Sequence, residues 1–527
     1  MKRLRIFVGA GAFLLCIVTP LFAQQVDIKT TGQIRVRYRD WQEFLMNNDL
    51  PVTSQGGQTR DRHYFDVRTR FGVTAKIEPG LTGVIELERY DDFGNHSTFG
   101  AAAQNRSAQG APGSSTDVGG VGGDINQGIP TNTDSIYFRQ AFVDWAIPGT
   151  PIHIAGGRQL YTVGGSVVFS SAAYGADGIQ VYSQLGPGTL GAYWWKPQTD
   201  VDRRFGTNDF NLFGGSYKFE WMARNTVELY GMVSQDKSRA ANFIRLNPGN
   251  TTGGGSSCGA AASGTATGVA TSAIGGDCGF TNEFYAGASF FGVQGPFTYR
   301  AEGAYQGGTA RKNVINTLSG VQGDIDREAF MIVGGVSYAL VPELSLNLDG
   351  GWASGDDSPG DNTYSNFASV YGLFQPTLLF SEGNPYGNTA AAQFGNQATN
   401  RSIFGTTFGT QDLDLATNAA ATLDNNGQRF SPGMFYAKPG VKWVPFKQLT
   451  INGDVGLLWA AVSPGGVSSY IGTEADIKAA WQVYKNLVVN WYFAYLFAGG
   501  YFDGPAGQVG HNVDDPWLST IEFILTF

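Results

Sequence analysis

The stretch that decides the fold is Trp517-Leu-Ser-Thr-Ile-Glu-Phe-Ile-Leu-Thr-Phe527, at the end of the chain. Successive side chains of a β-strand point to opposite faces, so every second residue shares a face. The stretch therefore predicts a strand with one apolar face and one mostly polar face. The apolar face carries Ile521, Phe523, Leu525 and Phe527, and the other face carries Thr520, Glu522, Ile524 and Thr526.

A phenylalanine at the end of such a strand resembles the closing strand of bacterial outer-membrane β-barrels, where it serves as an insertion signal. The beginning of the chain agrees with export. Lys2, Arg3 and Arg5 precede an apolar run over residues 6–18, and Ala23 offers a cleavage site. We therefore expect residues 1–23 to be a signal peptide and residues 24–527 to form an outer-membrane barrel. The apolar run is too short for a retained spanning helix.

The composition fits an exported barrel. Charged residues make up 15% of the chain and aromatic residues 13%, and there are 74 glycines. An ordinary soluble protein carries about 25% charged residues. Strands with one face in lipid and aromatic girdles at the interfaces need few charges and many aromatics. Removing residues 1–23 takes away three positive charges and no negative ones, so the formal net charge changes from -9 to -12.

Short alternating segments separated by turn residues follow one another along the chain, each about the length of a tilted spanning strand. They predict eighteen strands, near residues 28–40, 60–77, 80–91, 133–147, 151–160, 177–186, 188–198, 207–221, 223–236, 281–294, 296–307, 324–340, 343–354, 430–445, 448–462, 470–483, 486–498 and 515–527.

The connections between these strands alternate in length. Tiny turns such as Gly186-Pro187 and Tyr484-Lys485 alternate with long segments, of which 92–132, 237–280 and 355–429 are the longest. Short periplasmic turns and long extracellular loops are typical of a transmembrane antiparallel β-barrel with an even strand number. A soluble protein of several sheets is the alternative, and it would make the signal peptide, the terminal phenylalanine and the loop pattern coincidences.

Charged residues within the strand patterns are expected to line the pore, because the lumen of such a barrel is polar. Five arginines on the first two strands would form one wall beside two glutamates of the third. That wall is either a ladder that attracts anions or a set of salt bridges that keeps the lumen ordered. The expected pore-lining residues are Arg35, Arg37, Arg39, Arg68, Arg70, Arg158, Arg300, Lys438, Lys442, Lys478, Glu86, Glu88, Glu474 and Asp476.

Two loops suggest further features. Cys258 and Cys278 both fall in a Gly/Ser/Thr/Ala-rich stretch, and two cysteines in one loop of an exported protein predict a disulfide. Asp356, Asp357 and Asp361 lie close together in the sequence and form a weak calcium candidate. Their spacing does not match an EF-hand loop, so a solvated acidic turn is the favoured interpretation, and we expect no metal and no cofactor.

Several stretches resemble the alginate-export family of outer-membrane proteins. They are Phe138-Arg-Gln-Ala-Phe-Val-Asp144 followed by Gly157-Arg-Gln159, Ala353-Ser-Gly-Asp-Asp357, Gly472-Thr-Glu-Ala-Asp476 and Phe497-Ala-Gly-Gly-Tyr501. The resemblance implies a monomeric barrel of eighteen strands with a basic conduit for a polyanionic polysaccharide. The chain departs from the family at Tyr161-Thr-Val-Gly-Gly-Ser-Val167, where a further basic residue is expected.

The favoured function is a porin-like channel of the outer membrane that passes anionic solutes, or exports an acidic polysaccharide such as alginate, by passive diffusion. A structural or surface-binding barrel that acts as a sheath or scaffold for a partner is the alternative. We expect no enzyme activity, because the histidines at 63, 96, 153 and 511 lack catalytic or metal-ligand spacing. The expected partners are membrane lipid and lipopolysaccharide, the anionic cargo and a periplasmic export protein, but no nucleic acid.

Overall fold

The structure is a computed structural model of the whole chain. It describes residues 26–42, 62–77, 80–93, 136–172, 175–198, 210–236, 281–315, 322–356, 363–367, 369, 377–379, 433–463, 468–501 and 515–527. The predicted signal peptide, the loop 237–280 and both of its cysteines lie outside the described residues, as does most of the loops 92–132 and 355–429.

Eighteen antiparallel strands form a closed barrel, as the sequence predicts. The strands of the wall are β1 (Val26–Gln42), β2 (Arg62–Ile77), β3 (Leu81–Phe93), β4 (Ile136–Ala146), β5 (Ile152–Gln159), β8 (Ala176–Leu185), β9 (Gly188–Gln198), β10 (Phe210–Met222), β11 (Asn225–Asp236), β12 (Thr281–Gln294), β13 (Phe297–Ile315), β14 (Gln322–Val341), β15 (Leu344–Ala353), β17 (Met434–Phe446), β18 (Leu449–Trp459), β19 (Tyr470–Tyr484), β20 (Leu487–Ala498) and β21 (Trp517–Thr526). No helix in the described part of the chain is long and apolar enough to cross a membrane.

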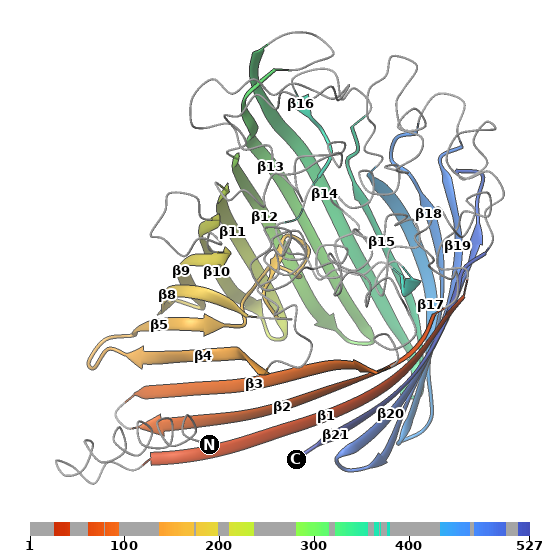
Figure 1. Cartoon of the computed structure of the whole chain (residues 1–527), viewed down its shortest axis with the longest axis horizontal. Coiled ribbons are helices and arrows are strands. Elements are labelled where there is room, and N and C mark those ends of the chain that lie inside the picture. The colour runs from red at the N-terminus through yellow and green to blue at the C-terminus, as the bar shows by residue number, and fades with distance from the viewer. Residues whose placement is uncertain are drawn as a thin grey trace, which may run out of the picture.

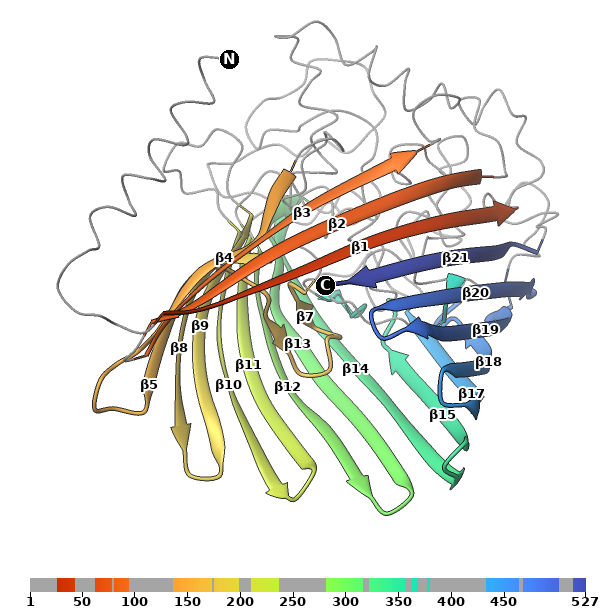
Figure 2. The same cartoon turned by 90° about the horizontal axis from the view of Figure 1, so that it is seen from below.

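The ring closes where β21 pairs with β1, and the two strands run side by side in both views of the barrel (Figures 1 and 2). Their register runs from Gln33 opposite Thr526 to Gln42 opposite Trp517. The amide of Gly32 donates to the carbonyl of Phe527 (2.8 Å), and the amide of Phe527 donates to the carbonyl of Gly32 (3.0 Å). The terminal strand that the sequence singled out therefore leaves the barrel without an open edge.

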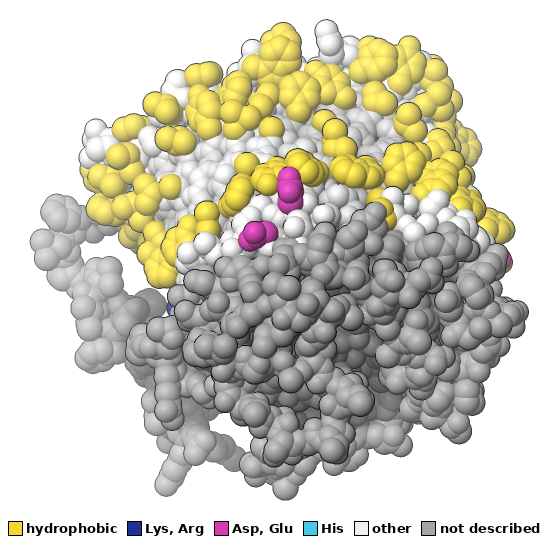
Figure 3. Space-filling view, turned by 90° about the horizontal axis from the view of Figure 1, so that it is seen from above, with side chains coloured by type: hydrophobic (Ala, Val, Ile, Leu, Met, Phe, Trp, Pro, Cys, Tyr) yellow, Lys and Arg dark blue, Asp and Glu magenta, His cyan; other side chains and the backbone are white. Residues whose placement is uncertain are grey.

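The outer face of the barrel is apolar. Alternate residues of β21 illustrate this. Ile521, Phe523 and Leu525 are exposed on the outer face, whereas Leu518 and Thr520 occupy inward positions and are buried. Hydrophobic side chains dominate the described surface in the space-filling view, and few charged side chains interrupt them (Figure 3). A wall of this kind matches lipid on the outside, because neighbouring strands pair around the whole ring and the outward side chains are apolar.

A short hairpin lies inside the ring of strands (Figure 2). It consists of β6 (Thr162–Val163) and β7 (Phe169–Ser170) and belongs to the connection between β5 and β8. Its apolar side chains are buried against inward-facing residues of β9 to β12. The buried cluster contains Val163, Val167, Val168, Phe169, Tyr193, Trp195, Leu212, Tyr230, Met232 and Tyr285.

One carboxylate fixes the tip of this hairpin. Glu302 of β13 accepts hydrogen bonds from the amide of Gly165 (2.6 Å) and from the hydroxyl of Tyr230 (2.8 Å). Gly164 has a φ of 61°, and a Cβ there would lie 2.5 Å from a Glu302 oxygen. Only glycine fits this turn, because the backbone is left-handed and the carboxylate approaches too closely for a side chain.

A second segment also enters the ring, between β15 and β17. It includes β16 (Thr363–Tyr364), which pairs with β14 in parallel, and Phe367, whose ring meets the edge of Tyr285. Farther along, the amide of Leu379 donates to Glu474 (2.6 Å) and the amide of Leu378 donates to Asp476 (3.2 Å). The two inward segments therefore contact the wall from β9 to β19.

Candidate functional site: the inner wall from β1 to β4

The arginine row of β1 faces the inside of the barrel. Arg35, Arg37 and Arg39 are 6–9% exposed, whereas Ile34 and Val36 between them are 36% exposed on the outer face. This follows from the alternation of a strand, as the sequence indicates. The long side chains lie next to β2 on one side and β21 on the other.

Asp66 of β2 holds the arginine row together. Its carboxylate lies 2.9 Å from Arg35, 2.7 Å from Arg37 and 3.4 Å from Arg39, and its side chain is fully buried. Glu522 of β21 adds a longer contact to Arg35 at 3.6 Å. A buried carboxylate shared by three guanidinium groups fixes their positions.

Arg68 is less compensated than its neighbours. Its guanidinium donates one hydrogen bond to the neutral amide of Gln33 (3.0 Å), and its Nε atom has no hydrogen-bond partner among the described residues. Arg35 lies directly opposite in the strand register, so two positive charges face each other across β1 and β2. Among the six arginines of the wall, Arg68 is the one with no carboxylate within 4.0 Å in the described part of the chain.

The wall continues across β3 and β4 as a second network. Arg70 pairs with Glu88, and Arg139 of β4 lies 2.6 Å from Glu86 and 3.7 Å from Glu88. Gln140 also donates to Glu86 (2.9 Å). Two consecutive residues, Arg139 and Gln140, thus reach the same carboxylate, because an irregularity in the β3–β4 register turns both to the inside.

Six arginines and four carboxylates among the described residues make up these two networks. The six arginines are Arg35, Arg37, Arg39, Arg68, Arg70 and Arg139, and the four carboxylates are Asp66, Glu86, Glu88 and Glu522. The ion pairs match the expectation of a salt-bridged wall, and the anion-attracting role of the row stays a prediction. Five of these six arginines lie within 4.0 Å of one of these carboxylates, and Arg68 has no carboxylate within that distance among the described residues.

The remaining basic residues divide between two faces. Arg300 faces the lumen and binds Asp349 (2.7 Å). Lys438, Lys442 and Lys478 alternate with exposed apolar residues and also face inward, and no ion pair within 4.0 Å joins them to a carboxylate in the part of the chain that is described. Lys438 and Lys478 lie near Asp454.

Arg158 is a correction to the predicted pore lining. It lies opposite Asp177 in the register and contacts it at 3.3 Å. Asp177 shares its face of β8 with the exposed Ile179 and Val181, which belong to the outer surface. The neighbours Ala155 and Gln159 are the buried, inward residues of β5, so alternation directs Arg158 outward.

Glu474 and Asp476 are the second correction. Both project to the inner side of β19, but they are 0% and 2% exposed because residues 377–379 cover them. Thr377 adds a hydrogen bond to Glu474 (2.7 Å). These carboxylates anchor an inward segment and do not form an open pore surface.

The acidic turn and the cysteine pair predicted for the loops lie mostly outside the described residues. Asp356 is buried, whereas Asp357 and Asp361 lie outside the described residues. The described residues contain no group of three potential metal ligands. Cys258 and Cys278 also lie outside the described residues, so the disulfide stays a prediction.

Sequence reasoning missed Asp66 and Arg139 as members of the site. Asp66 could have been predicted, because this residue precedes Arg68 by two positions and therefore shares the inner face of β2. Arg139 could not be predicted in this way, since the alternation of β4 is broken at its irregular pairing with Glu86 and Leu87. Its place depends on the register of two strands that are far apart in the sequence.

Comparison with solved structures finds similar outer-membrane proteins at low identity. The chain is similar to OccK5 (OpdH) of Pseudomonas aeruginosa, with 9% identity, coverage of 95% of this chain and 98% of that one, and a TM-score of 0.48. OccK8 (OprE) of the same organism has 12% identity, the same coverage and a TM-score of 0.48. The outer membrane channel DcaP of Acinetobacter baumannii has 11% identity, coverage of 95% and 97%, and a TM-score of 0.40.

A search of curated proteins found no match. The sequence of residues 52–400 matches the model of the alginate export family. This match covers well over half of the chain and spans β2 to β16, including three of the four carboxylates and three of the six arginines of the inner wall. The protein is therefore an outer-membrane channel and belongs to the alginate export family.

Proposed function

We propose that the channel passes anions by diffusion along the inner wall from β1 to β4, and that its cargo is an anionic solute or an acidic polysaccharide such as alginate. The observation that carries the proposal is the row of inward arginines on these four adjacent strands, among them Arg68, which has no carboxylate within 4.0 Å among the described residues. Rings or rows of Arg and Lys are the usual lining of anion-selective pores. The proposal includes a monomeric protein without catalytic activity.

The arginines would act partly at a distance. Arg35, Arg37 and Arg39 have side chains only 7–10% exposed, so their charge reaches the lumen mainly as an electric field. Arg70 and Arg139 are more accessible, at 19% and 12%. An anion therefore meets a positive potential along the row and direct guanidinium contacts near β3 and β4.

The inward segments support a path on this side of the lumen. The hairpin β6/β7 covers inward residues of β9 to β12, and residues 377–379 cover the carboxylates of β19. The inward residues directly beneath these two segments are buried. The same arrangement places the carboxylates Glu302, Glu474 and Asp476 under protein, where they repel a passing anion less than they would at the surface.

Substitution of Arg68→Ser tests the proposal. We expect the reversal potential in a salt gradient to shift toward cations and the block by an acidic oligosaccharide to weaken. Both effects should shrink above about 0.15 M salt, where charges are screened within roughly 8 Å. Single-channel recordings in planar bilayers provide the measurement.

Arg158→Ser is the matched control, because it removes the same charge from the outer face. It should leave ion preference and block unchanged. An Arg68→Ser channel with unaltered reversal potential and block at low salt would show that the wall is purely structural. A neutral oligosaccharide of equal length separates charge from size, and it should block less than the acidic one.

A further inference from the structure

A separate pocket opens on the inner wall beneath the tip of the hairpin β6/β7. Its volume is about 240 Å³, and β10 to β14 contribute most of its lining. Drug-sized ligands occupy pockets of roughly 300–1,000 Å³, so this one suits a single small ring. It shares no residue with the arginine wall.

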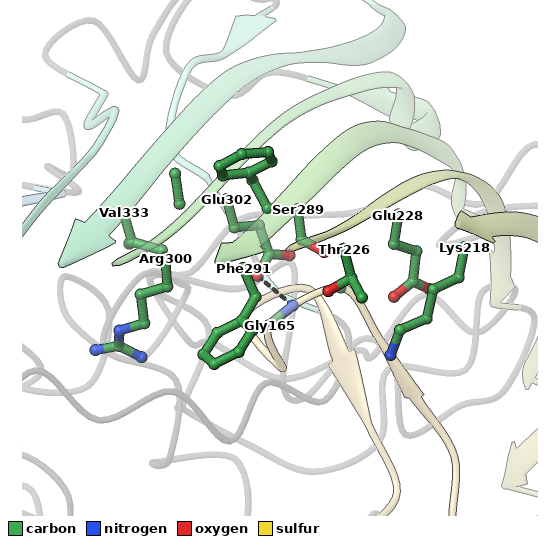
Figure 4. Close-up of a pocket in the computed structure, with 12 residues that line it drawn as sticks. Gly165, Lys218, Thr226, Glu228, Ser289, Phe291, Arg300, Glu302 and Val333 are labelled. Atoms are coloured by element: carbon green, nitrogen blue, oxygen red, sulfur yellow. Dashed lines mark hydrogen bonds between the residues drawn. The ribbon is translucent and has the colours of Figure 1, made fainter. Parts of the chain in front are cut away.

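An exposed aromatic ring marks this pocket. Phe291 is 49% exposed, although it faces the inner side of β12 together with the buried Tyr285 and Glu283. In the close-up its ring lies between the side chains of Arg300 and Lys218 (Figure 4). The register places Phe291 next to Thr226 on one side and Arg300 on the other. An apolar ring face that stays open to a polar lumen is a binding surface for another ring.

The polar groups around Phe291 are balanced in charge. Lys218 lies opposite Glu228 in the register, and Arg300 is paired with Asp349. The hydroxyl groups of Thr226 and Ser289 also line the pocket, and neither has a hydrogen-bond partner among the described residues. Donors and acceptors alternate without a net excess of positive charge, which suits a hydroxyl-rich ligand and does not suit a multiply charged anion.

We propose that this pocket binds one pyranose ring, which carries at most one carboxylate. The apolar face of the sugar would stack on Phe291, its hydroxyl groups would contact Thr226, Ser289 and Glu228, and a carboxylate would contact Lys218. The inference goes beyond the proposed anion path and stands without it, because it uses other residues on a different part of the wall.

Block of single-channel current by glucose and by glucuronate tests the proposal. Both sugars should block the intact channel at concentrations up to roughly 100 mM, and glucuronate should block at the lower concentration. Phe291→Ala should raise the half-blocking concentration of both sugars about fivefold. Phe291→Leu keeps the apolar bulk but loses the ring face, so it should also raise the half-blocking concentration of both sugars.

Phe284→Ala is the control on the same strand, since Phe284 is exposed on the outward face of β12 and does not line the pocket. It should leave block by both sugars unchanged. Lys218→Met should weaken glucuronate block and leave glucose block as it is. The proposal is overturned if neither sugar blocks the intact channel. It is also overturned if both sugars block the Phe291→Ala channel at the same concentrations as the intact channel. Glucose carries no charge, so its block reports on this pocket even where the anion path proves wrong.

Discussion

The two sides of the lumen are built in opposite ways. The wall from β1 to β4 is held by charges, with Asp66 between three arginines and Glu86 between Arg70 and Arg139. The wall from β9 to β12 is held by apolar contacts, with Trp195 and Leu212 fully buried under the hairpin β6/β7. Both walls consist of inward-facing residues, so the inner face of a barrel is polar only where no other part of the chain covers it.

The difference has an energetic basis. Burying an apolar side chain the size of Phe169 contributes about 1.5–3 kcal/mol, and several such side chains anchor the hairpin. Buried charges are different, because the cost of removing them from water offsets most of their attraction. The charged wall therefore adds little net stability, and its arrangement favours a role in transport.

Removal of the hairpin β6/β7 should have the largest effect on conductance, because it would uncover the apolar side of the lumen. Gln159 and Ala176 pair directly in the register, so a short Gly/Ser turn can replace residues 161–175 without disturbing β5 and β8. We expect single-channel conductance to rise severalfold, because the hairpin occupies the lumen. Replacement of the turn Ala223-Arg224 between β10 and β11 by Asn-Gly is the control and should have little effect, because this turn lies outside the buried cluster. Unchanged conductance in the hairpin deletion would mean that the current flows entirely elsewhere.

Asp66→Asn should act on the charged wall alone. Three guanidinium groups would lose their shared carboxylate, and breaking buried ion pairs costs about 3–5 kcal/mol. We expect a lower unfolding temperature of the barrel and a reversal potential shifted toward anions. Asp177→Asn, which removes the carboxylate beside Arg158 on the outer face, should change neither quantity much. A cation-shifted potential in Asp66→Asn would contradict the proposed anion path.

Glu302→Gln should produce the smallest change, since it keeps the apolar seat of the hairpin. The carboxylate accepts from both Gly165 and Tyr230, but an amide has only one oxygen, so one donor loses its partner. Such a loss costs about 1–3 kcal/mol. We expect increased current noise at nearly constant mean conductance. The exposed Glu328→Gln serves as control, and quiet recordings from Glu302→Gln would show that apolar contacts alone hold the hairpin.

Much of the fold was predictable from the sequence because alternation is a local property. Ile521, Phe523 and Leu525 lie outside as the pattern indicates, and Arg35 and Arg37 lie inside. The residue pattern within each strand shows which of its two faces is apolar, and each short turn shows which two strands are neighbours. Strand number, closure and the family therefore followed from the sequence.

The partners of the charged residues were predicted less well. Arg158 required knowing which face of β5 is buried, and Arg139 required the irregular register between β3 and β4. Both depend on pairing between strands, whereas the sequence shows only the order of residues within each strand.

The sequence by itself determined a closed eighteen-stranded barrel with an apolar outer face and arginines on the inside, because a period of two residues and the alternation of loop lengths are written along the chain. Only the tertiary structure decided which inner residues meet water. Asp66 gathers three arginines, and Glu302, Glu474 and Asp476 bind inward segments. The reason is that such contacts join residues from 29 to 137 positions apart, and only the closed ring brings them within hydrogen-bond distance.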